Sequence, residues 1–145
     1  MQEARLPRWR LRRWAERALA GAFDDGLVDF SAAELSLRLV GTAEGRRLNR
    51  DFRGRDYATN VLTFEYGVDP LGVARGDIVM CVPVLVREAR EQRKTLLDHA
   101  AHLTIHGVLH SLGYDHIKAR DAKRMEALET ATLARIGIAD PYVAA

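Results

Sequence analysis

The stretch TLLDHAAHLTIHGVLHSLG, residues 95–113, is long and mostly apolar, which predicts a buried helix. Apolar residues occupy almost every face of this helix, so we expect it to pack against a sheet and other helices. Gly113 is well placed to end it, because glycine readily adopts the left-handed backbone conformation that closes many helices. The fold is therefore expected to be organised around this segment.

Helix and strand patterns alternate along the rest of the chain. Helical spacing covers residues 7–23, 42–52, 84–94 and 120–137, and strand patterns cover residues 34–40, 60–66 and 77–82. The polar residues 53–60 predict a loop, and residues 67–76 predict a turn. The third strand, DIVMCV, is continuously apolar, as expected of a strand covered on both sides. This order predicts an α/β (α+β) fold, in which a small mixed sheet packs against helices.

The first predicted helix, residues 7–23, is amphipathic with a basic outer face. Pro7 suits its first turn, and Trp9 and Trp14 lie on its apolar side. We expect a surface helix docked by its tryptophans. Binding to a membrane surface is a weaker alternative, because the apolar face is short.

Length and composition indicate one domain spanning residues 1–145. The chain is 48% hydrophobic and 29% charged, which is ordinary for a globular protein. It lacks an apolar run of the ~20 residues needed to span a bilayer, and its N-terminus lacks the apolar core of a secretory signal. A single cysteine, Cys81, excludes an intramolecular disulfide. We therefore expect a cytoplasmic protein with no membrane partner.

Three histidines stand close together in HGVLHSLGYDH, residues 106–116. His106 and His110 are four residues apart, so a helix places them on one face, one turn above the other. Gly113 can then reverse the chain and bring His116 back towards them. Three neutral imidazoles without a thiolate suit Zn²⁺ and leave a fourth position open for water, as in catalytic sites. We predict one Zn²⁺ per chain, which this late helix and the turn after it bind.

A second ligand pair is also compatible with the sequence. His99 and His102 lie on roughly the same helical stripe, and His102 is four residues before His106. The pair of His106 and His110 is preferred, because only this pair lies one turn from the reversal that carries His116. We expect His99 and His102 to be polar residues behind the ligands or along the groove.

The spacing of His106 and His110 is also that of H-E-x-x-H zinc proteases. Gly107 occupies the position at which those proteases carry the glutamate that serves as general base, and Asp115 is poorly placed to replace it. Either the ion suffices, because zinc lowers the pKa of its water to about 7, or the substrate is not a peptide. The glycine therefore indicates a different chemistry at the same ligand spacing.

With these residues identified, the sequence resembles the YbeY family of bacterial endoribonucleases, also called rRNA maturation factors. Residues 106–116 match the family pattern H-G-x-L-H-x-L-G-Y-D-H without a gap. NRDFRGRDYATNVLTF (49–64) and RGDIVMC (75–81) are similar to two further family segments. The likeness continues from Glu88 to Tyr142. Family members usually begin with a strand before the first helix, so here that strand is expected to be short or absent.

The resemblance implies a single α/β domain with zinc held by His106, His110 and His116. It implies single-strand-specific RNA cleavage in 16S rRNA 3′-end maturation, ribosome quality control and small-subunit assembly. The implied partners are RNA, as the 16S rRNA precursor, and the small ribosomal subunit with its proteins. The functionally important arginine of the family falls on Arg53.

Arginines cluster at residues 46–55, and a guanidinium offers a planar fork that suits phosphate. Arg53 is therefore expected to act in catalysis by gripping the scissile or an adjacent phosphate. Residues expected to bind the RNA further out are Arg55, Arg50, Arg46 and His102. For the outer arginines a merely solvated surface is an equal alternative. Asp77, at a strand start, is expected to be structural.

Two other functions are compatible with the sequence. The protein could act mainly as a ribosome-assembly or RNA-binding factor, with zinc that chiefly holds the last loop. The open coordination position argues against a purely structural zinc. A metalloprotease is the third candidate, and the absence of a glutamate at position 107 argues against it.

Overall fold

The computed structural model describes residues 6–115 and 117–142. Within them, the helices and strands follow one another in the predicted order. The helices are α1 (Arg8–Asp25), α2 (Thr42–Arg53), α3 (Val82–Glu91), α4 (Leu96–Ser111) and α5 (Ala119–Arg135). The strands are β1 (Ala32–Val40), β2 (Val61–Val68) and β3 (Val73–Cys81).

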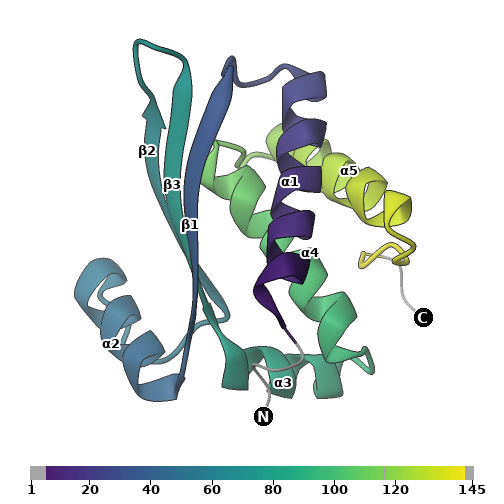
Figure 1. Cartoon of the computed structure of the whole chain (residues 1–145). Helices are drawn as coiled ribbons and strands as arrows, with labels where there is room; N and C mark the ends of the chain where they lie inside the picture. Colours follow the sequence, from purple (N-terminus) through teal and green to yellow (C-terminus); the bar gives the residue numbers. More distant parts are fainter. Residues whose placement is uncertain (1–5, 116, 143–145) are drawn as a thin grey trace.

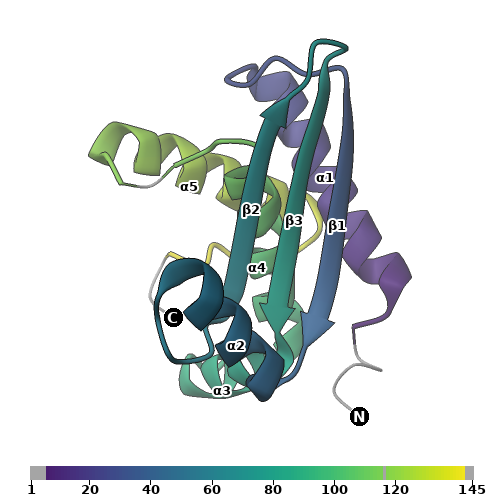
Figure 2. The ribbon, with the colours of Figure 1, turned by 90° about the vertical axis from the view of Figure 1, so that its left-hand side faces the viewer.

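The sheet of the described chain is three-stranded, in the order β1-β3-β2. The central strand β3 runs parallel to β1, with Ile78 opposite Leu37, and antiparallel to β2, with Ile78 opposite Thr63. Figure 2 shows this sheet face-on. The mixed sheet confirms the predicted α+β class. The expectation that a strand before α1 is short or absent concerns residues 1–5, which lie outside the described residues.

Helix α4 is the centre of the fold, as predicted. Helices α1 and α4 cover one face of the sheet, and α5 packs against both of them, while α2 crosses one end of the opposite face (Figures 1 and 2). Side chains of α4 that are fully buried in this core include Ala101, Ile105, Val108 and Leu109. A smaller apolar cluster on the α2 side contains Val79 and Cys81 of β3. The end of β3 is therefore covered on both faces, as its apolar sequence predicts.

Local interactions define both ends of α4. At the start, the Thr95 side chain accepts a hydrogen bond from the Asp98 amide at 3.1 Å, which caps the helix. At the end, Gly113 adopts a φ of 109° and turns the chain away from the helix axis. The predicted helix over 95–113 and the predicted role of Gly113 are both confirmed.

The prediction of a turn over residues 67–76 is wrong for most of that segment. Residues at its two ends belong to β2 and β3, and the link between the strands is short. The Asp69 carboxylate accepts hydrogen bonds from the amides of Leu71 at 2.9 Å and Val73 at 3.0 Å, and this closes the turn. Val73 and its successors look turn-like in sequence, but their backbone pairs with β1 on one side and β2 on the other.

The expectation that both tryptophans dock α1 is half right. Trp14 is buried, whereas Trp9 is 58% exposed, with the guanidinium of Arg10 4.6 Å from its ring centre. Burial of α1 instead comes from Leu11, Trp14, Ala18 and Ala22, which follow helical spacing. Among the described helices, none combines the length and apolar character that crossing a membrane requires.

Gly76 of β3 lies against Ser111 at the end of α4, which gives a prediction about stability. A Cβ at this position would lie 2.8 Å from Ser111 Cβ and 3.2 Å from the Phe64 carbonyl oxygen. Because backbone cannot easily give way, Gly76→Ala is expected to destabilise the protein by about 1–3 kcal/mol. Urea unfolding measures this difference as a lower midpoint. Gly41→Ala is the control, since nothing lies within 4 Å of a Cβ there; equal midpoints for the two variants would contradict the prediction.

Candidate metal centre

Helix α4 directs two of the predicted ligands into one cavity. His106 and His110 lie one turn apart, with ring centres separated by 6.1 Å. Both line a cavity of about 460 Å³ that lies between α4, the edge strand β2 and the end of α2. The other lining residues are Phe52, Arg53, Thr59, Asn60, Val61, Thr63 and Phe64. The cavity thus combines two imidazoles and a guanidinium with the polar residues Thr59, Asn60 and Thr63.

Each of these histidines is fixed through its Nδ1 atom. His110 Nδ1 lies 2.9 Å from the Tyr114 carbonyl oxygen, and His106 Nδ1 lies 3.0 Å from Glu129 Oε2. A carbonyl or a carboxylate can only accept, so each Nδ1 carries the proton and the lone pair of the neutral ring is on Nε2. Histidines that bind metals commonly have this arrangement. The two residues therefore fit as Nε2 ligands of Zn²⁺.

The turn after α4 is tied to the other helices. The Tyr114 amide donates to the Leu109 carbonyl at 3.1 Å, and the buried Tyr114 hydroxyl donates to Asp25 Oδ2 of α1 at 2.5 Å. Arg124 of α5 donates to the same carboxylate oxygen at 3.1 Å. The carbonyl that orients His110 therefore belongs to an anchored residue. The third predicted ligand, His116, lies outside the described residues and remains a prediction.

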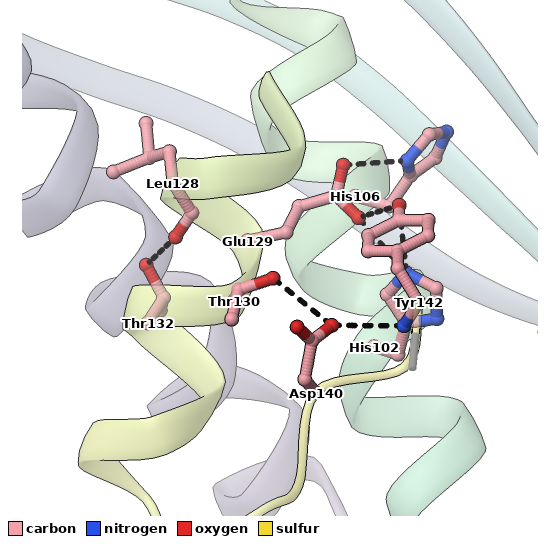
Figure 3. Close-up of polar contacts among 8 residues, drawn as sticks. All are labelled: His102, His106, Leu128, Glu129, Thr130, Thr132, Asp140 and Tyr142. Carbon is pink, nitrogen blue, oxygen red and sulfur yellow. Dashed lines mark hydrogen bonds and ion pairs between the residues drawn. The ribbon is translucent and has the colours of Figure 1, made fainter. Parts of the chain in front are cut away.

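A buried carboxylate, which the sequence patterns did not predict, lies behind His106. Glu129 of α5 has no exposed surface, and its Oε1 atom accepts hydrogen bonds from His102 Nε2 at 2.8 Å and the Tyr142 hydroxyl at 2.6 Å (Figure 3). Burial alone raises the pKa of Glu129, but the donors from His102, His106 and Tyr142 outweigh it and lower the pKa to about 2. The group is therefore an ionised acceptor at neutral pH.

One signal in the sequence could have revealed Glu129. Met125, Glu129 and Leu133 are spaced four apart on the buried stripe of α5, so a charged residue occupies an apolar position. Such a residue needs a partner elsewhere in the fold.

His102 and Glu129 form, with His106, a second group that could hold a metal ion. One ligand atom from each of the three residues lies within 4.8 Å of the others. This group corresponds to the alternative histidine pair that the sequence allows. However, His102 and Glu129 are not among the described residues that line the cavity, whereas His110 is. His106 and His110 therefore line the cavity, whereas His102 and Glu129 lie behind it.

The structure separates the predicted arginines. Arg53, the last residue of α2, is exposed and lines the cavity with His106 and His110. Arg46 forms a two-pronged ion pair with Asp56, at 2.8 and 3.0 Å. Other partners of the cluster are Asp51, which lies 3.2 Å from Arg50, and the Tyr57 hydroxyl, which lies 3.3 Å from Arg55. Arg46, Arg50 and Arg55 are exposed and are not found among the described lining residues.

His99 supports the cavity wall from behind, consistent with its expected supporting role. It is buried, and its Nε2 atom donates to Glu88 Oε1 at 2.9 Å. The same carboxylate accepts a hydrogen bond from Asn60 Nδ2 at 3.1 Å, and Asn60 lines the cavity. Asp77 likewise has a structural role, since it accepts hydrogen bonds from Ser36 at 2.5 Å and Tyr66 at 2.7 Å.

Gly107 has a packing role in this arrangement. A Cβ at this position would lie 3.0 Å from Ile78 Cγ2 and 3.4 Å from Val61 Cγ2. The glycine lets α4 approach the sheet, and a glutamate there would enter this contact. The position that carries the glutamate base in zinc proteases therefore serves here to pack α4 closely against the sheet.

A small α+β fold with two histidines and an arginine around one cavity defines a candidate metal-dependent enzyme. A family model described as Endoribonuclease YbeY matches residues 1–137. The endoribonuclease YbeY of Bordetella avium (strain 197N) is 80% identical over 143 residues, which cover 99% of this chain and 89% of the relative. That of Acidovorax sp. (strain JS42) is 54% identical over 142 residues, which cover 97% and 86%. The chain therefore belongs to the YbeY endoribonuclease family.

A solved structure is also similar in fold. The solution structure of TM1509 from Thermotoga maritima superimposes with a TM-score of 0.58 and covers 94% of each chain. Its sequence is 24% identical to this chain, so the similarity supports the arrangement of helices and strands alone.

Proposed function

We propose that this protein is a zinc-dependent, single-strand-specific endoribonuclease that acts in 16S rRNA 3′-end maturation, ribosome quality control and small-subunit assembly. The observation that carries the proposal is the cavity that brings Arg53 together with His106 and His110 in a member of this family. The partners in this proposal are the 16S rRNA precursor and the small ribosomal subunit, in the cytoplasm.

In this proposal His106, His110 and His116 hold one Zn²⁺. Bound there, the ion supplies a Lewis acid and an activated water near neutral pH. The guanidinium of Arg53 binds the scissile or an adjacent phosphate and stabilises the charge that grows on its oxygens during cleavage. The hydrogen bonds of His106 and His110 through Nδ1 keep their rings oriented towards the cavity. In this proposal, orientation of the histidine rings and stabilisation of the phosphate charge therefore replace the contribution that a glutamate base makes in the proteases.

Aromatic side chains at the cavity support a preference for single strands. The Phe52 side chain lines the cavity and is 64% exposed, and its ring meets Phe64 edge-on at 5.2 Å. Tyr57, in the loop after α2, is 52% exposed. Unpaired bases stack on exposed aromatic rings, whereas bases within a duplex are already stacked on each other. RNA with flexible single-stranded segments is thus the substrate class that suits this surface.

The outer arginines would follow the RNA backbone. Arg46 and Arg50 have carboxylate partners, so a phosphate must compete with Asp56 or Asp51 for them. Such exposed contacts are weak and decrease with salt. We propose that Arg46, Arg50 and Arg55 contribute to affinity in a salt-dependent way, while Arg53 contributes to catalysis.

The function is tested by measuring cleavage of an unstructured RNA and of the same sequence in a duplex by highly purified protein. We expect cleavage of the unstructured RNA, loss of this activity after zinc is removed with a chelator, and recovery when Zn²⁺ is returned. The duplex should be resistant. Full activity in the zinc-free protein would contradict the proposal. In cells without the protein, normal 16S rRNA 3′ ends would contradict the maturation role.

A further inference from the structure

We infer that Glu129 is a positioning residue, which holds the His106 ring so that its Nε2 atom is presented to the metal ion. This inference rests on the proposed metal centre and adds to it a residue from α5, a different helix from the one that carries His106. Glu129 and His106 are 23 residues apart in sequence and lie 3.0 Å apart at Oε2 and Nδ1.

The contacts of the carboxylate fix its orientation. One oxygen, Oε1, accepts hydrogen bonds from both His102 and Tyr142, at 2.8 and 2.6 Å. These two donors come from α4 and from the segment after α5, and they prevent the carboxylate from rotating freely. The other oxygen, Oε2, is thereby directed at His106 Nδ1 (Figure 3). A ring that donates from Nδ1 must present its lone pair at Nε2.

The segment after α5 closes this network. The Asp140 carboxylate accepts hydrogen bonds from the Tyr142 amide at 2.8 Å and from Thr130 at 3.3 Å, which folds the segment back onto α5. The Tyr142 ring then packs edge-on against His102, with ring centres 5.4 Å apart. Tyr142 thus lies against His102 and against the carboxylate oxygen Oε1 that His102 also contacts.

Burial is the second argument for a specific role. Glu129 has no exposed surface and occupies a position on the stripe of α5 that otherwise packs apolar side chains. An ionised carboxylate in such a place is unfavourable unless its hydrogen bonds are satisfied. A leucine would pack there without this requirement. The hydrogen bond to His106 gives the carboxylate a function that a leucine cannot perform.

The competing interpretation is that Glu129 itself binds the ion together with His102 and His106. In that case Glu129 would have to direct its lone pairs at the ion and give up hydrogen bonds to the two histidines. His102 Nε2 also lies 3.2 Å from the Tyr142 hydroxyl, which donates to Glu129 in the same network. If Glu129 is a ligand, loss of His102 should weaken zinc binding more than loss of His110. If Glu129 is a positioning residue, loss of His110 should weaken zinc binding more.

The test measures zinc affinity of the full-length protein by competition with a chromophoric chelator. Glu129→Gln is expected to weaken zinc binding about 10- to 100-fold, as is typical when the partner of a metal-bound histidine is removed. Glu126→Gln is the matched control, because Glu126 is a half-buried carboxylate three residues earlier on the same helix. Its affinity should stay within about twofold of wild type. Circular dichroism and urea unfolding establish that each variant is folded.

A second measurement reports the positioning directly and does not depend on bound zinc. Long-range ¹H–¹⁵N NMR of the zinc-free protein identifies which nitrogen of His106 carries the proton. Wild type and Glu126→Gln should show the proton on Nδ1, whereas Glu129→Leu should show a mixture of tautomers. An unchanged His106 tautomer in folded Glu129→Leu would overturn the inference.

Two further variants separate the positioning role from the ligand role. His110→Gln should abolish zinc binding, while His102→Gln should weaken it by no more than about tenfold. The reverse pattern would make His102 and Glu129 the ligands and would overturn the inference. Absence of zinc binding by wild type would remove the proposed metal centre and the inference together. Equal zinc affinities for wild type and Glu129→Gln would remove the inference alone.

Discussion

His110→Ala is expected to lose zinc-dependent cleavage of single-stranded RNA by about 10³-fold or more, while the protein remains folded. The imidazole is one of the two proposed ligands that line the cavity among the described residues, and without it the charge stabilisation of several kcal/mol that a metal would supply is lost. The side chain is partly exposed, so its removal leaves the apolar core of α4 intact.

The measurement is the rate of cleavage of a labelled RNA by wild type and variant purified in parallel. Urea unfolding and circular dichroism check the fold, and zinc content is measured on the same samples. Cleavage at the wild-type rate by zinc-free His110→Ala would indicate a contaminating nuclease and contradict the assignment. Loss of cleavage with unimpaired rescue of 16S rRNA 3′ ends in cells would instead favour the assembly-factor function.

Arg53→Ala is expected to slow cleavage by about 10²- to 10³-fold with zinc affinity unchanged, which is the usual effect of removing a group that stabilises charge in the transition state. Arg53 lines the cavity from the end of α2, whereas the network around Glu129 is formed by side chains of α4, α5 and the segment after α5. Arg53→Lys retains the charge but loses the planar fork, so it should recover only a part of the rate.

Arg50→Ala is the matched control for this prediction. Arg50 is an exposed arginine on the same helix, and its partner Asp51 is 3.2 Å away. We expect a loss of a few-fold in affinity that diminishes as salt is raised, with little change in the rate at saturating RNA. Equal rates for Arg53→Ala and Arg50→Ala would show that Arg53 is an ordinary surface contact. Loss of bound zinc in Arg53→Ala would assign it a structural role.

Local patterns were sufficient to predict the order of helices and strands and the central position of α4. Its apolar residues occupy all sides of a helix, and the structure buries it between the sheet and the helices α1, α3 and α5. The prediction of a turn over 67–76 was wrong for most of the segment. Glycine and proline there indicate a break in local structure, whereas the pairing of Val73 with β1 extends strand β3. Pairing between distant strands is not encoded in local sequence.

The candidate site was predictable only in part for the same reason. The four-residue spacing of His106 and His110 follows from helix geometry, so their convergence on one cavity could be expected. The position of Arg53 beside the histidines rested on the family resemblance, because β2, β3 and α3 lie between it and α4 in the chain. Glu129 reaches His106 from another helix, and only the tertiary packing of α5 on α4 brings the two together.

The hydrogen bond between Tyr114 and Asp25 has a consequence for how this protein opens. The turn that orients His110 is anchored to the last residue of α1, and Arg124 of α5 meets the same carboxylate. The histidine turn therefore cannot detach by itself without breaking contacts that hold the first and last helices. Local opening at the site and release of the N-terminal helix should belong to one cooperative unit with a shared free energy of opening.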